Sequence, residues 1–138
     1  MQNIKAEDFM DRTPLSFAPS IGVITALRKL LAAKLSGAPV VDSENNLVGF
    51  LSEADCMRGA LMGSYYTSVG ELVQDRMTTT VNSINPETNL VDVAENFLIN
   101  HHQILPVVQD NKVVGLIERH RLLEKLMQQI DHNESLVA

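Results

Sequence analysis

Residues 37–55 read GAPVVDSENNLVGFLSEAD, and this stretch decides the fold. It predicts an apolar strand over 38–42, a polar turn, a second apolar strand over 47–51 and then a helix that opens at Ser52. Two strands joined by so short a turn pair as an antiparallel hairpin. A weaker version of the same pattern recurs at residues 105–121, which indicates a repeat.

The repeat extends well beyond the hairpin. Identical residues stand 67 positions apart at Asp8/Asp75, Met10/Met77, Ser16/Ser83, Pro19/Pro86, Leu31/Leu98, Pro39/Pro106, Val40/Val107 and Val41/Val108. After the turn, Val48/Val114 and Gly49/Gly115 stand 66 apart, which one deletion in the second turn explains. We therefore predict two tandem repeats, residues 1–64 and residues 65–138.

Each repeat is predicted to run strand, helix, strand, strand, helix, which is an α/β (α+β) fold. In the first repeat the expected elements are a short helix or loop over 1–12, an extended piece over 15–17 and helices over 20–34 and 52–61 around the hairpin. In the second they are helices over 69–76, 87–101 and 119–130, an extended piece over 81–84 and strands over 104–109 and 113–117. Residues 63–68, rich in glycine and hydroxyl side chains, are predicted to link the repeats. Strands 40–41 and 107–108 are apolar on both faces, so the repeats are expected to pack together.

Composition excludes several classes of protein. The chain has 138 residues, 45% of them hydrophobic, which is enough to bury a core. Its net charge of −6 and the absence of a basic patch argue against binding to nucleic acid or to an anionic membrane surface. Cys56 is the single cysteine, so no internal disulfide is possible, and the sequence does not start with a signal-peptide core, which predicts the cytoplasm. The apolar stretch 21–35 is interrupted by basic residues and is shorter than the roughly 20 residues of a membrane span, so it predicts a core-facing helix.

Ser52 and Asp55 are the candidate binding residues, and two readings of them stay open. A serine at the start of a helix lies near free backbone N–H groups, where a phosphate binds well, and an aspartate one turn along could accept both hydroxyls of a ribose. Alternatively, Ser52 is a helix N-cap, and Asp55 or Glu53 is a favourable acid in the first turn.

The repeated motifs resemble a tandem pair of cystathionine-β-synthase-type (CBS) domains, also called a Bateman module, over residues 5 to 130. The motifs are a Met-Thr-like opening at 10–13 and 77–80, a proline before each long helix, PVVD at 39–42, VGF at 48–50 and SEAD at 52–55. The resemblance implies two repeats packed about a pseudo-twofold axis, with clefts that take AMP, ADP, ATP or S-adenosylmethionine. It also implies a non-enzymatic regulatory role, a homodimer, and a target protein that the sequence does not name.

The resemblance also implies further site residues. The loop before the hairpin would line the base pocket through Ser36, Gly37, Ala38 and Pro39. The extended opening with Thr13 and Leu15 would form another wall. For Gly37, a helix C-cap is the alternative reading, and it is compatible with this role.

The second repeat departs from the motif, because Glu118 and Arg121 stand where the first repeat has Ser52 and Asp55. Glutamate repels phosphate and arginine cannot accept from hydroxyls, so we expect one adenosyl site at most. Arg119 and Arg121 could instead supply positive charge toward a phosphate tail, or simply begin a solvated helix. A dimeric scaffold with a degenerate, unliganded cleft is the alternative function.

The remaining conspicuous residues favour structural roles. His101 and His102 diverge by about 100° on a helix and have no Cys or third His beside them, so no metal site is predicted. His101 could contact a ligand or lie at the edge of the core, and Cys56 is predicted to be a small buried hydrophobe. Met57, Met62 and Met127 suit either core filling or a dimer face. No nucleophile and base pair and no phosphate loop is found, so no enzyme is predicted.

Overall fold

The computed structural model describes residues 3–66 and 70–137, and it divides into two compact units. One, the β1–β2 unit, comprises Pro14–Asn82 and Asp110–Val113. The other, the β3–β4 unit, comprises Met1–Thr13, Ser83–Gln109 and Val114–Ala138. Each unit therefore combines the opening segment of one sequence repeat with the body of the other.

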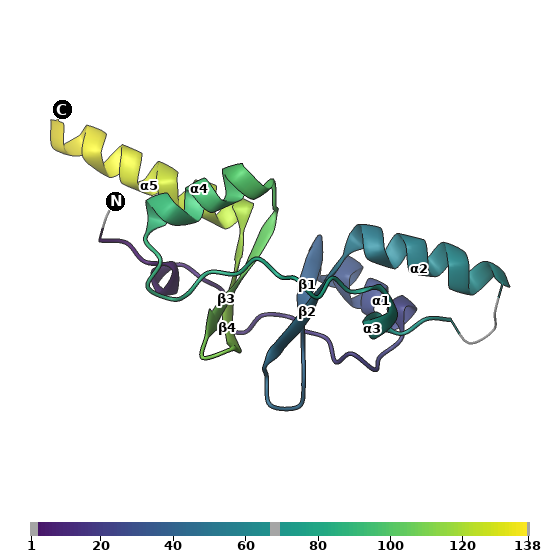
Figure 1. Cartoon of the computed structure of the whole chain (residues 1–138). Coiled ribbons are helices and arrows are strands. Elements are labelled where there is room, and N and C mark those ends of the chain that lie inside the picture. The colour runs from purple at the N-terminus through teal and green to yellow at the C-terminus, as the bar shows by residue number, and fades with distance from the viewer. Residues whose placement is uncertain (1–2, 67–69, 138) are drawn as a thin grey trace. The chain divides into compact units, whose positions relative to one another are not determined.

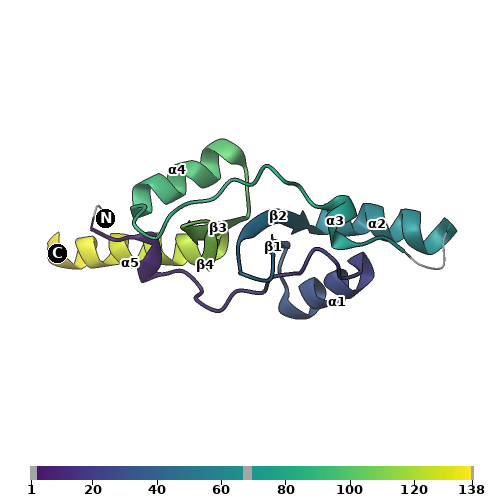
Figure 2. The ribbon, with the colours of Figure 1, turned by 60° about the horizontal axis from the view of Figure 1, so that its bottom comes forward.

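The β1–β2 unit is built on the predicted hairpin (Figure 1). Its elements are α1 (Val23–Ala33), β1 (Gly37–Val41), β2 (Leu47–Ser52), α2 (Glu53–Tyr66) and α3 (Val73–Arg76). β1 and β2 are antiparallel, with Gly37 opposite Ser52 and Val40 opposite Gly49, and a bulge follows at Val41. Helices α1 and α2 lie side by side next to the hairpin in both views (Figures 1 and 2).

The β3–β4 unit repeats this plan. Its elements are a 3₁₀ turn η1 (Ala6–Asp8), α4 (Leu90–Asn100), β3 (Ile104–Gln109), β4 (Lys112–Glu118) and α5 (Arg119–Val137). The tip of the β3–β4 hairpin, Asp110–Val113, is grouped with the β1–β2 unit. There the side-chain amide of Asn45 donates to the Val113 carbonyl at 2.7 Å.

Backbone pairing confirms the repeat at the level of single residues. Phe17 pairs with Val40 as Ile84 pairs with Val107, and the members of these pairs are 67 residues apart. In the same way Thr78 pairs with Phe50 and Asp11 with Leu116. The extended pieces predicted over 15–17 and 81–84 are therefore not full strands, because each forms a single β-bridge, at Phe17 or at Ile84. The fold is the expected mixture of helices and strands.

Both hairpins are buried as their apolar strands predict. Val40, Leu51 and Cys56 in one unit and Val107, Ile117 and Leu90 in the other are inaccessible to solvent. Cys56 is therefore the buried hydrophobe that the sequence predicts. The helix faces are less regular, because the corresponding residues Leu31 and Leu98 are largely exposed.

Several predicted helix boundaries are wrong. α2 continues to Tyr66, so residues 63–66 are helical rather than a linker, and Thr67 and Ser68 lie outside the described residues. Each of its two glycines, Gly59 and Gly63, costs the helix only about 1 kcal/mol, which the rest of the 14-residue helix offsets. α5 likewise runs to Val137, since no glycine or proline follows residue 130 to end it.

The long helices also end differently from the prediction. Lys34 ends α1 in the left-handed conformation, with φ 56°, and His101 ends α4 in the same way, with φ 54°. Gly37 is therefore the first residue of β1 rather than a helix cap. His101 caps its helix and is exposed, so it does not lie at the edge of the core.

Candidate functional site

The hairpin register brings the predicted base loop and the predicted ribose motif together. Gly37 pairs with Ser52, the last residue of β2. The first N–H of α2, that of Glu53, donates to the Ser36 carbonyl at 2.8 Å. Ser36, Gly37, Ser52 and the start of α2 are therefore neighbours within the β1–β2 unit.

Ser52 and Asp55 form a reciprocal cap at the start of α2. The Asp55 N–H donates to Ser52 Oγ at 3.2 Å, and the Ser52 N–H donates to Asp55 Oδ2 at 2.9 Å. This is the capping-box arrangement, which stabilises a helix start by satisfying two backbone donors. Ser52 is therefore the N-cap of α2, as one of the two interpretations predicts. The backbone N–H groups of Glu53 and Asp55 already have hydrogen-bond acceptors.

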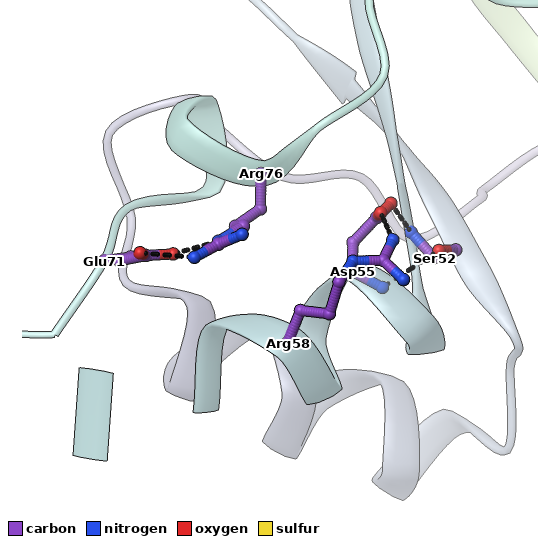
Figure 3. A network of polar contacts seen from close by, with 5 residues as sticks. All are labelled: Ser52, Asp55, Arg58, Glu71 and Arg76. Atoms are coloured by element: carbon purple, nitrogen blue, oxygen red, sulfur yellow. Dashed lines mark hydrogen bonds and ion pairs between the residues drawn. The ribbon is translucent and has the colours of Figure 1, made fainter. Parts of the chain in front are cut away.

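Arg58 completes the surroundings of the Asp55 carboxylate (Figure 3). Its Nη2 donates to Asp55 Oδ1 at 2.7 Å from one turn further along α2. Asp55 is only 7% exposed, whereas the Arg58 side chain is 60% exposed. A carboxylate offers about four lone-pair sites. Each oxygen of Asp55 accepts one hydrogen bond from these partners, so each keeps capacity for one more.

A second ion pair lies in the same network (Figure 3). Arg76, at the end of α3, donates through Nη2 to Glu71 Oε1 at 2.7 Å and through Nε to Glu71 Oε2. The hydrogen bond to Glu71 raises the pKa of Arg76, and the nearby carboxylates of Asp75 and Asp55 raise it further. Arg76 in turn holds the pKa of Glu71 below its usual range. Both guanidiniums are thus within electrostatic reach of Asp55.

The other residues predicted for the base pocket of this unit have structural partners. Ala38 and Pro39 are fully buried, and Leu15 packs partly buried against the same core. At Gly37 a Cβ would stand 2.6 Å from the Phe50 ring and 2.9 Å from the Leu51 carbonyl oxygen. The small residue there admits the Phe50 ring, and Ser36 remains as a partly exposed side chain.

Thr13, Arg119 and Arg121 belong to the β3–β4 unit. Thr13 is exposed and donates through its N–H to Asp11 Oδ1 at 3.0 Å. The Arg119 N–H donates to the Gln103 carbonyl at 2.8 Å, which repeats the Glu53 to Ser36 bond. Arg121 lines a cavity of about 300 Å³, together with Asp8, Phe9, Met10, Asp11, Leu116, Glu118, His120 and Glu124.

The sequence pattern did not single out Arg58, Glu71 and Arg76. Arg58 could have been found from its spacing, because residues three apart on a helix are neighbours. Glu71 and Arg76 stand 67 residues after Ile4 and Phe9. A comparison of the two repeats therefore shows two charged residues in the second repeat where the first has two apolar ones. Phe9 is buried in the core of the β3–β4 unit.

Neither a metal centre nor a membrane span is found in the described part of the chain. Residues 3–66 and 70–137 contain no group of three or more His, Cys, Asp or Glu side chains placed to hold a metal ion. Within the same residues, no helix is both long enough and apolar enough to cross a membrane. His102 is exposed, as is His101.

These features define a class of protein: two small α/β repeats, each a hairpin flanked by helices, with one polar site at a helix start. The chain belongs to the CBS domain family, whose sequence profile matches residues 6–61 and 69–128. The match covers both sequence repeats and agrees with the family that residues 10–13, 39–42 and 52–55 indicate.

Two solved structures have the same fold. The structure of CBSX2 in complex with AMP has 30% sequence identity and a TM-score of 0.79, and the similarity covers 91% of this chain and 97% of that one. CBSX2 is a CBS-pair protein from Arabidopsis thaliana. A putative acetoin utilization protein from Vibrio cholerae has 25% identity and a TM-score of 0.82, with 96% of each chain covered.

Curated relatives are longer than this chain. An uncharacterized protein of Helicobacter pylori is 35% identical over 124 residues, which is 88% of this chain and 37% of the relative. The chloroplastic CBS domain-containing protein CBSX1 of Arabidopsis thaliana is 29% identical over 136 residues, 80% of this chain and 58% of the relative. The chain thus spans between about a third and three fifths of these two relatives.

Proposed function

We propose that this chain is a non-enzymatic regulatory module that binds one adenosine-containing ligand at the β1–β2 unit and signals its presence to a partner protein. The candidate ligands are AMP, ADP, ATP and S-adenosylmethionine. The observation that carries the proposal is the Asp55 carboxylate, which is buried, fixed by Ser52 and Arg58, and retains acceptor capacity on both oxygens. A vicinal diol such as that of ribose needs two adjacent acceptors of this kind.

Family membership supports the same assignment. CBSX2, which has the same fold at 30% identity, was crystallised with AMP. Within the proposal, Ser36 and Gly37 border the base, and Leu15, Ala38 and Pro39 form the backbone and core behind them. Thr13, Arg119 and Arg121 lie in the other unit, and their roles stay predictions from the family resemblance. The cytoplasm remains the proposed compartment, in keeping with a buried free thiol at Cys56.

Calorimetric titration of the full chain with the four ligands tests the proposal. We expect one of them to bind with one site per chain, and Asp55→Ala to lower its affinity by about tenfold or more, since a hydrogen bond to a charged group contributes about 1.5–3 kcal/mol. Asp8→Ala is the matched control, because Asp8 Oδ2 accepts a capping bond from the Lys5 N–H at 2.8 Å in the other unit. Full binding by Asp55→Ala, or no binding of any ligand to the native chain, contradicts the proposed site.

A second candidate function is a dimeric scaffold, and one observation favours the dimer. Large apolar side chains are exposed at corresponding positions of the two repeats: Leu31 (63%) and Leu98 (74%), Met57 (62%) and Leu123 (51%), Leu61 (58%) and Met127 (52%). A second copy of the chain presents the same faces and can cover both by a twofold operation. A solution mass of one chain contradicts the dimer, and a ligand-induced response contradicts pure scaffolding.

A further inference from the structure

The outer faces of α1 and α4 have the same apolar pattern. Residues three, four and seven positions apart lie on one face of a helix, and in both helices this face has apolar side chains that are at least partly exposed. The corresponding positions, 67 residues apart, are Ile24 and Val91, Leu27 and Ala94, and Leu31 and Leu98. Each unit therefore leaves one apolar helix face partly uncovered by its own residues.

One charged residue lies within each of these faces, and the two charges are opposite. Arg28 of α1 and Glu95 of α4 occupy corresponding positions, and both are exposed. α1 contains two basic residues, Arg28 and Lys29, and no acidic one, so its net charge is +2. α4 contains Asp92 and Glu95 and neither Lys nor Arg, so its net charge is −2. The same apolar face is thus basic in one unit and acidic in the other.

Charges on the neighbouring elements leave this contrast in place. Lys34, which ends α1, adds to its positive charge, and α5 is neutral overall because it has three basic and three acidic residues. The acidic residues of α2, of α3 and of the segment before α3 have other places or partners: Asp55 pairs with Arg58, Glu71 pairs with Arg76, Asp75 accepts from the Leu72 N–H, and Glu53 begins α2. Among the described residues, no ion pair engages Arg28, Lys29, Asp92 or Glu95.

Two copies of the chain can bring these faces together in two ways. If each helix meets its own counterpart, Arg28 faces a second basic helix and Glu95 faces a second acidic one, and like charges across an interface are unfavourable. If α1 meets α4, opposite charges face each other and Leu31 and Leu98 cover one another. In a twofold dimer this second contact is made twice, since each copy supplies both helices.

We infer that a second copy of this chain covers these faces in a head-to-tail arrangement, with α1 of each copy against α4 of the other. This inference rests on the dimer proposed as the second candidate function and adds which helices meet. The apolar side chains supply the attraction, whereas Arg28 and Glu95 select the arrangement by disfavouring contacts between like helices.

Sedimentation velocity of the full chain over a range of concentrations tests the inference. We expect Arg28→Glu and Glu95→Arg each to weaken the dimer about tenfold or more, because each places like charges across both contacts. The double variant Arg28→Glu/Glu95→Arg exchanges the two charges and should restore the affinity to within about threefold of the native value. Glu44→Arg, the same change at an exposed position of the turn between β1 and β2, should change it by less than about twofold.

Crosslinking identifies which helices meet. Leu31→Cys chains mixed with Leu98→Cys chains should form a crosslinked pair with a short bis-maleimide, whereas neither variant should form one alone. The native chain is the control for the reagent, because its one thiol, at Cys56, is buried.

Crosslinking of Leu31→Cys chains to one another, or a double charge variant that stays as weak as the single variants, overturns the head-to-tail arrangement while the dimer stands. A native chain with the solution mass of one chain overturns both the arrangement and the dimer, and it leaves the proposed ligand site untouched.

Discussion

Gly37 in β1 lies so close to the paired strand β2 that there is no room for a side chain. A Cβ added there would lie 2.9 Å from the Leu51 carbonyl oxygen and 2.6 Å from the Phe50 ring. The backbone oxygen belongs to the paired strand and cannot move aside without disturbing the ladder.

We expect Gly37→Ala to lower the free energy of unfolding by about 1–3 kcal/mol, as overpacking does in other proteins. Urea unfolding followed by circular dichroism measures it. Gly22→Ala is the control, since its nearest neighbour would be Thr25 Oγ1 at 3.8 Å, and it should change stability by less than about 1 kcal/mol. Equal stability of Gly37→Ala and the native chain would contradict this crowding within the hairpin.

Cys56 should make stability depend on alkaline pH. Burial, with smaller contributions from Asp55 and Glu53, raises the pKa of its thiol from 9.0 to about 11. The unfolded chain therefore loses the thiol proton before the folded protein does, and deprotonation favours unfolding. Stability that is present below about pH 9 is lost as the pH rises from about 9 to 11.

The measurement is urea unfolding of the native chain and of Cys56→Ala across this pH range. The native chain should lose stability more steeply than the variant, since the variant has no thiol to titrate. Parallel pH profiles for the two proteins would show that the thiol ionises equally in the folded and unfolded states.

The long helices α1 and α4 have different N-caps in the two repeats. Asn89 caps α4, where its Oδ1 accepts from the Asp92 N–H at 2.9 Å, whereas the corresponding residue of α1 is Gly22, which has no side chain. We expect Asn89→Ala to cost about 1 kcal/mol of stability and Asn89→Ser to retain most of it, because serine also caps. Equal losses in the two variants, measured by thermal unfolding, would point to a role other than capping.

The exposed apolar helix faces bear on the assembly of the whole molecule. If a second copy covers them, replacing Met57 or Leu123 with glutamate places a charge in the interface and should reduce the solution mass to that of one chain. Sedimentation velocity measures this. Gln74→Glu, an exposed position of α3, adds the same charge elsewhere and should not change the mass. A dimer that survives both apolar substitutions would exclude these faces.

The sequence alone determined the repeat, both hairpins and the family, whereas it left open whether Ser52 and Asp55 form a helix cap, which the structure shows. Each of these depends on residues within a few positions of one another or on identities at one offset, which a linear pattern records. Helix ends were predicted less well, because α2 and α5 continue past the points where the apolar pattern stops and have no residue there that ends a helix.

Tertiary structure alone decided which segments share a unit. The opening segment joins the body of the second repeat through bonds such as that from the Asp11 N–H to the Leu116 carbonyl, at 2.8 Å. It also decided the Glu71–Arg76 ion pair and the exposure of Leu31 and Leu98. These contacts join residues that are distant in sequence or at non-helical spacing, and the free energy that selects them comes from packing in three dimensions, which no local pattern contains.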